Sequence, residues 1–270
     1  MKKIILIITL SISSLLLSNP GDLYNAAEKG NLKKVKILLE KGADPNLKFR
    51  WHKVTPLHGA SYNGHLKIVK LLLINGAKIN IRNKNGDTPL HYASYKGNVN
   101  IIRFLINKGA HVNALDFSGF TPLHGASRFG HYKAVNVLIS RGAKINIISF
   151  STGRNETPLL EATRNGSYRV VKILINNKAI VNISNSDGET PLHYASRHGN
   201  IKMVSLLIKK GSKVNKTNKN GYTSLDMAYI YMKGKKHKIK EYNNVINLLK
   251  KAGSARTHKG IINTKNSKGK

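Results

Sequence analysis

Cysteine is absent from the 270-residue sequence, which excludes disulfides, thiolate nucleophiles and cysteine-based zinc or iron–sulfur sites. Acidic residues are scarce, with 12 Asp and Glu against 46 Lys and Arg. The sequence shows no paired carboxylates at catalytic spacing, no Gly-rich phosphate loop and no Ser-His-Asp order. We therefore expect no enzymatic activity, no catalytic residues, no cofactor and no metal site.

The formal net charge of +34 has two interpretations. Lysine supplies 36 of the 46 basic residues, and isoleucine and asparagine are also abundant. A/T-rich codons favour these three residues, so part of the charge reflects base composition and fits a bacterial protein with an A/T-rich genome. A field of this sign still attracts anionic surfaces, and nucleic acid or an anionic membrane stays open as a partner.

Long apolar runs are missing except at the N-terminus, where Lys2 and Lys3 precede an apolar run over residues 4–17. This layout is typical of a secretory signal peptide, which we predict over residues 1–18. As a helix the run spans about 21 Å, less than the ~30 Å hydrocarbon core of a bilayer. Cleavage after residue 18 places Leu16 where a small residue is preferred. Export to the periplasm or the exterior is therefore predicted, while an uncleaved membrane anchor or a buried first helix stays open.

A hexapeptide of the form Thr-Pro-Leu-His-x-Ala recurs along the chain. The copies begin at Thr55, Thr88, Thr121, Thr157 and Thr190, and a degenerate copy begins at Thr223. The offsets are 33 residues except for one of 36, which follows from a three-residue insertion within residues 149–155. Self-similarity at this period indicates a repeat architecture.

Each copy predicts the same local structure. Threonine caps a helix and proline occupies its first position, where the missing N–H needs no partner. A glycine nine residues after the threonine, such as Gly64, ends this helix in a left-handed conformation. A second helix with apolar spacing follows, and a polar stretch such as residues 80–86 turns the chain back as a hairpin. One such unit cannot bury a core, whereas stacked copies do.

These motifs resemble the ankyrin repeat family over residues 21–253. The resemblance implies an all-α-rich solenoid of helix-turn-helix pairs joined by β-hairpin loops. It predicts an N-terminal capping repeat over residues 19–54 and a degenerate C-terminal capping repeat over 223–253, followed by a basic disordered tail over 254–270. Between the caps it predicts repeats at 55–87, 88–120, 121–156, 157–189 and 190–222.

The resemblance also assigns the recurring histidines a structural role. His58, His91, His124 and His193 occupy one repeat position, so neighbours lie about 8–10 Å apart, too far to share one metal ion. In the family this imidazole ties the hairpin backbone to the helix. At the end of another second helix Lys178 stands where other repeats have glycine, and we expect strain in that turn.

The resemblance further implies a monomeric, non-enzymatic scaffold that binds a protein partner through its concave face. Partners generally contact positions four, three and one before each threonine, and seven and eight after it. Six of the 25 positions so selected are aromatic, although aromatic residues make up 7% of the chain. The predicted partner-binding residues are Trp51, Tyr62, Lys84, Tyr95, Lys96, Phe117, Phe120, Arg128, Phe129, Arg164, Arg197 and His198.

Three interpretations of these positions stay open. The aromatic residues and the arginines that follow them form a groove, with the arginines suited to an acidic segment of the partner. Alternatively, several rings pack against the adjacent hairpin. In the third interpretation the charge dominates, and residues 233–240 with the tail bind phosphates or anionic lipid, with Tyr229, Tyr231 and Tyr242 available for stacking.

Overall fold

The computed structural model describes residues 21–150 and 153–257. The predicted signal peptide and residues 258–270 of the predicted tail lie outside the described residues. Within them the chain forms two compact units, one of residues up to 122 with 137–143, the other of 123–136 with 144 onward. No helix in these ranges is long and apolar enough to cross a membrane.

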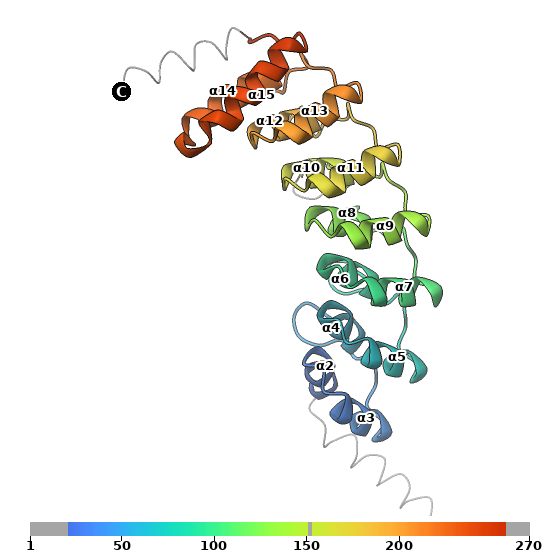
Figure 1. Cartoon of the computed structure of the whole chain (residues 1–270). Coiled ribbons are helices and arrows are strands. Elements are labelled where there is room, and N and C mark those ends of the chain that lie inside the picture. Colours follow the sequence, from blue (N-terminus) through green and yellow to red (C-terminus); the bar gives the residue numbers. More distant parts are fainter. Residues whose placement is uncertain (1–20, 151–152, 258–270) are drawn as a thin grey trace, which may run out of the picture. The chain divides into compact units, whose positions relative to one another are not determined.

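Unit 1 contains three helix pairs, and Figure 1 shows the two helices of each pair side by side. The pairs are α2 (Asp22–Glu28) with α3 (Leu32–Glu40), α4 (Pro56–Asn63) with α5 (Leu66–Ile74), and α6 (Pro89–Lys96) with α7 (Val99–Asn107). First helices pack on first helices and second helices on second helices. Their apolar faces, including the fully buried Leu57, Leu72 and Ile102, form the core between successive pairs.

Unit 2 continues the same alternation of helices. It contains α10 (Pro158–Arg164), α11 (Tyr168–Asn176), α12 (Pro191–Arg197), α13 (Ile201–Lys209), α14 (Ser224–Lys233), η2 (Lys236–Lys238) and α15 (Ile239–Lys251). Helices α8 (Pro122–Arg128) and α9 (Tyr132–Ser140) include the boundaries between the units. The loops are turns with isolated bridges such as Phe49–Val54, and no extended strand occurs in the described ranges. The helical solenoid fold is confirmed.

The histidine of each hexapeptide links a helix to the next hairpin. The backbone N–H of Thr55 donates to Nδ1 of His58 at 3.2 Å, so Nδ1 is an acceptor and the proton resides on Nε2. Nε2 then donates to the carbonyl of Asp87, 3.1 Å away in the following hairpin. The same contact recurs from His91 to Phe120, from His124 to Glu156 and from His193 to Tyr222. The structural role predicted for these histidines is confirmed.

Left-handed residues end both helices of a repeat. Gly64 ends α4 at φ +86°, and Gly142 ends the second helix of its repeat at +85°. Lys178 occupies the equivalent position after α11 and retains the left-handed conformation at φ +69°. Because a side chain at positive φ crowds its own backbone, this turn is strained as expected.

The last helix pair departs from the others. Helix α15 begins at Ile239 and has 13 residues, whereas the second helices of the earlier pairs have nine. After it, residues 254–257 return to the preceding loop, where the backbone N–H of Ala255 donates to Oδ1 of Asn215 at 2.8 Å. The same side chain donates to the carbonyl of Gly253. Residues 254–257 thus start a loop as every earlier repeat does, although no helix pair follows them in the described part of the chain.

Candidate functional site

The hairpin tips of unit 1 carry three large side chains in a row. The backbone N–H of Lys84 donates to the carbonyl of His52 at 2.9 Å, and that of Phe117 donates to the carbonyl of Asn85 at 2.9 Å. These bonds fix each tip on the preceding one. Trp51 and Phe117 remain 77% and 70% exposed, and Lys84 lies between their repeats.

The loop that carries Trp51 is strained. Arg50 and Lys53 adopt positive φ values of 56° and 51°, although neither is a glycine. They are two of four such residues in the described ranges. Strain of this kind costs of order 1–3 kcal/mol per residue and is concentrated at functional sites in proteins. The chain therefore holds Trp51 outward at an energetic cost.

A second aromatic group lies at the ends of the first helices. The ring of Tyr62 meets Tyr92 edge-on at 5.8 Å, and Lys96 Nζ lies 4.7 Å from the centroid of Tyr62. Tyr92 is 6.1 Å from Tyr95, whose hydroxyl donates to Asp87 at 2.7 Å at the base of a hairpin. This chain of contacts connects the helix ends to the tips. We call Trp51, Tyr62, Lys84, Lys96 and Phe117 the aromatic face.

Two predicted contact residues of unit 1 belong to its packing. Phe120 is 3% exposed and its ring lies 6.5 Å from that of Tyr95, so its prediction as a partner contact is wrong. Its carbonyl also accepts a hydrogen bond from Nε2 of His91 at 3.1 Å. Tyr95 is half-buried between Tyr92 and Asp87. The interpretation that rings pack against the hairpin therefore holds for these two residues.

The predicted arginines of unit 2 are paired with buried carboxylates. Glu161 is fully buried and accepts from Arg128 at 2.7 Å and from Arg164 at 2.8 Å. Burial alone would raise the pKa of Glu161, but these two guanidinium groups outweigh it and lower the pKa below its ordinary value. This arrangement differs from the predicted row open to an acidic partner, because Arg128 and Arg164 hold an internal carboxylate.

The remaining predicted residues of unit 2 also make internal contacts. Arg197 pairs with Glu189, and its guanidinium lies over the ring of Tyr231 at 5.0 Å. His198 contacts the carbonyl of Arg164 through Nε2 at 2.8 Å and so links α12 to α10. Phe129 is 57% exposed, and its ring stacks on that of His131 at 6.3 Å.

The tyrosines expected to stack on nucleic-acid bases are engaged within the protein. Tyr242 is fully buried and its hydroxyl donates to the carbonyl of Arg197 at 2.5 Å, so the expectation for Tyr242 is wrong. The guanidinium of Arg256 covers Tyr229 at 4.5 Å. Tyr242 is therefore part of the repeat core and is not available to stack on a base.

Sequence reasoning missed Tyr92 and Glu161. Both occupy the variable position of the hexapeptide, where Gly59 and Gly125 stand in other copies. A large or charged residue at a position that two copies fill with glycine must find space on the inner side of the first helix. The difference between glycine in some copies and a large or charged residue in others could have indicated that Tyr92 and Glu161 lie on this side of the helix.

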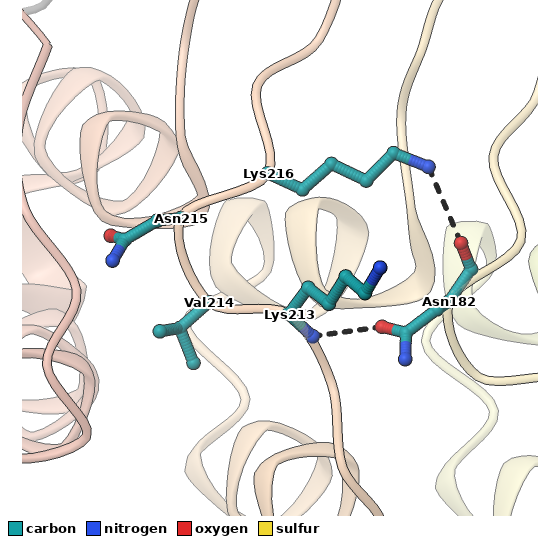
Figure 2. A pocket seen from close by; sticks show the side chains of 5 residues that line it. All are labelled: Asn182, Lys213, Val214, Asn215 and Lys216. Carbon is teal, nitrogen blue, oxygen red and sulfur yellow. Dashed lines mark hydrogen bonds between the residues drawn. The ribbon is translucent and has the colours of Figure 1, made fainter.

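Unit 2 also has an open hollow, drawn in Figure 2 and lined by Asn182, Lys213, Val214, Asn215 and Lys216. The backbone N–H of Lys213 donates to Oδ1 of Asn182 at 2.8 Å, and Lys216 Nζ donates to its carbonyl at 3.3 Å. Asn80 likewise accepts the backbone N–H of His111 between earlier loops, and both asparagines donate Nδ2 to the carbonyl of a glycine. The hollow is therefore the gap between two loops linked in the standard way of this fold. In the described ranges no three His, Asp or Glu side chains are grouped as metal ligands.

A stack of capped helix pairs linked by histidines at a 33-residue period defines a helical repeat protein. A family model described as ankyrin repeats in three copies matches residues 15–83, 57–149 and 148–218. The human ASB11 ankyrin repeat domain, solved as a crystal structure, is similar at a TM-score of 0.67 with 30% identity, covering 76% of this chain and 90% of that chain. No curated protein sequence matches. The chain belongs to the ankyrin repeat family, whose members are generally protein–protein interaction scaffolds and typically non-enzymatic.

Proposed function

We propose that this protein is a non-enzymatic scaffold that binds another protein through the concave side of unit 1, at the aromatic face. One observation carries the proposal: Trp51 and Phe117 expose most of their rings on hairpin tips that backbone bonds hold in a fixed row. Large exposed apolar side chains on a rigid frame are typical of binding hot spots. The strained loop at Trp51 supports the same site.

The corresponding tips of unit 2 carry charged side chains, and Phe150 is 60% exposed in the same hairpin as Arg154. Arg154 and Asp187 lie on consecutive tips and form an ion pair at 3.4 Å. An exposed pair of this kind satisfies its own charge and contributes little apolar area. The contrast between the two units favours unit 1 as the binding site.

Affinity capture with the full chain tests this function. We compare the wild type with the double variant Trp51→Ala/Phe117→Ala in cell lysates at low and high salt. The matched control is Ile74→Ala on α5, because Ile74 is 82% exposed and lies outside the aromatic face. A protein that the wild type and the control retain at high salt, and that the double variant loses at unchanged melting temperature, is the expected result. Retention of the same proteins by all three would overturn the proposal.

Electrostatic binding of nucleic acid or anionic lipid is a second candidate function. The net charge of +34 and the lysine-rich segment at residues 233–240 favour it. The burial of Tyr242 and the coverage of Tyr229 argue against a stacking site in that segment. Capture of only nucleic acid or lipid by every variant, with release at high salt, would support this function instead.

A further inference from the structure

We propose that the occupant of the aromatic face is an acidic segment in the polyproline II conformation, with a carboxylate on Lys84 and apolar side chains on Trp51 and Phe117. This inference rests on the proposed function and adds the chemistry and the spacing of the partner. It differs from the sequence-based expectation, which assigned recognition of an acidic segment to the arginines of unit 2.

Two lysines of the face are positioned in advance by aromatic rings. Lys84 Nζ lies 3.7 Å from the centroid of Trp51, and Lys96 Nζ lies 4.7 Å from that of Tyr62. Both contacts cross from one repeat to the next, so the stacking of repeats sets the position of each ammonium group. A lysine already held in one place loses less rotamer freedom on binding a carboxylate than a free one.

The aromatic face contains no acidic side chain, and the acidic residues near it are engaged with other partners. Glu28 on α2 accepts the hydroxyl of Tyr24 at 2.8 Å. Asp87 and Asp116 are the acidic residues between positions 47 and 120. Asp87 is buried and accepts the hydroxyl of Tyr95 at 2.7 Å. Asp116 accepts two backbone N–H groups of its own loop at 2.8 Å. Charge complementarity therefore points to a partner that supplies the carboxylates itself.

The spacing of the tips selects the conformation of the occupant. Stacked helices lie about 8–10 Å apart, and each repeat contributes one tip. In a polyproline II segment, residues three apart lie on the same side and are separated by about 9 Å. Trp51, Lys84 and Phe117 occupy the tips of three consecutive repeats. Lys84 Nζ lies 3.7 Å from the centroid of Trp51, so the backbones of the tips, not the ends of their side chains, set this spacing. The matching segment is apolar, acidic and apolar at positions one, four and seven.

Selection from a displayed library of random dodecapeptides on the full chain tests the inference, with counter-selection against Trp51→Ala/Phe117→Ala. We expect enriched peptides to carry Asp or Glu three residues from a large apolar residue on each side. Two outcomes would overturn the inference and leave the proposed function standing. The selected peptides depend on Trp51 and Phe117 but lack acidic residues, or their two apolar residues are seven positions apart, as on one face of a helix. If no selected peptide distinguishes the wild type from the double variant, the proposed function itself fails at this surface.

A selected peptide then tests the contact with Lys84 directly. Fluorescence anisotropy compares the acidic peptide with its Gln analogue on the wild type and on Lys84→Gln. We expect Lys84→Gln to lower the affinity for the acidic peptide about five- to tenfold and to leave the affinity for the Gln analogue unchanged. The control is Lys70→Gln, because Lys70 lies over the ring of Phe104 on the second helices, with the same chemistry on another side of unit 1. The contact would be overturned if Lys84→Gln lowered the affinity for both peptides equally, or if Lys70→Gln lowered the affinity for the acidic peptide as much as Lys84→Gln does.

Discussion

Asp226 holds Thr257 by two hydrogen bonds, since its Oδ2 accepts the backbone N–H at 3.1 Å and the hydroxyl at 3.0 Å. Arg256 Nε donates to the other carboxylate oxygen at 3.3 Å. In four earlier repeats this position is a histidine that donates to the next hairpin. At residue 226 an acceptor replaces the donor, because the returning segment presents N–H groups to it. The carboxylate therefore fastens residues 254–257 to the last helix pair.

Substitution of Asp226 by alanine is expected to lower the free energy of unfolding by about 2–3 kcal/mol, because Thr223 loses its capping partner and Thr257 its acceptor. Urea denaturation followed by circular dichroism measures this. In a chain that ends at Gly253 the same substitution should cost less than half as much, since Arg256 and Thr257 are already absent. An equal cost in both chains would show that the fastening contributes nothing.

Replacing Lys178 by glycine should stabilise the protein by about 1 kcal/mol, since glycine adopts positive φ without the crowding of a side chain. The matched reverse change is Gly142→Lys, because a Cβ at Gly142 would meet no atom within 4 Å and only the backbone conformation is tested. The Gly142→Lys variant should be less stable than the wild type by a similar amount. Thermal melting of the three proteins gives the comparison, and an unchanged or lower melting temperature for Lys178→Gly would contradict the strain.

Stability should fall between pH 6.5 and pH 4. Burial lowers the pKa of His58 and of His124 to about 4, and the accepting role of Nδ1 in His58 opposes a proton there. The unfolded chain binds protons on these rings near pH 6.5, so stability is complete above that pH and is lost as the pH falls towards 4. Each ring contributes at most about 3 kcal/mol over this window.

Denaturation midpoints at several pH values check this expectation, with His124→Leu as the comparison. The chain itself carries Leu160 at the equivalent position of the next repeat, where it is fully buried. The variant should show a shallower dependence on pH than the wild type, even if its stability at pH 7.5 is lower. Identical slopes would mean that His124 does not titrate in this window.

Removing the buried charge of Glu161 should be costly for unit 2. Glu161→Ala leaves two guanidinium groups without their carboxylate, and we expect a loss of about 3 kcal/mol or more. Arg128→Ala and Arg164→Ala should each cost less, because the other arginine still pairs with the buried carboxylate. The double arginine variant should exceed the sum of the two single losses. Simple additivity in urea denaturation would contradict a shared carboxylate.

The sequence was sufficient to predict the helix pairs and the left-handed Lys178, because each depends on residues close together in one repeat. The histidine links join residues 29 to 32 positions apart and were predicted from the resemblance to the ankyrin repeat family. Phe120 was predicted to be a surface contact because it directly precedes Thr121 in the sequence, yet it is buried. Position along the hairpin gives the side on which a residue lies but not its depth, which depends on the neighbouring Tyr95.

The pairing of the arginines was equally hidden from the sequence. Arg128 and Glu161 are separated by 33 residues, and only stacking brings them together. A charge is therefore judged as exposed or paired only when the adjacent repeat is considered with it. Trp51 and Phe117 were predicted correctly as exposed side chains, since they remain 77% and 70% exposed.

The bonds between successive hairpin tips use main-chain atoms alone, from Lys84 to His52 and from Phe117 to Asn85. Any residue that has a backbone N–H can therefore stand at positions 84 and 117 without loss of the link. Proline is the exception, because it lacks the N–H. New binding preferences can thus arise by point mutation at the tips while the histidine-linked frame continues to fold, so recognition and folding can evolve separately in this chain.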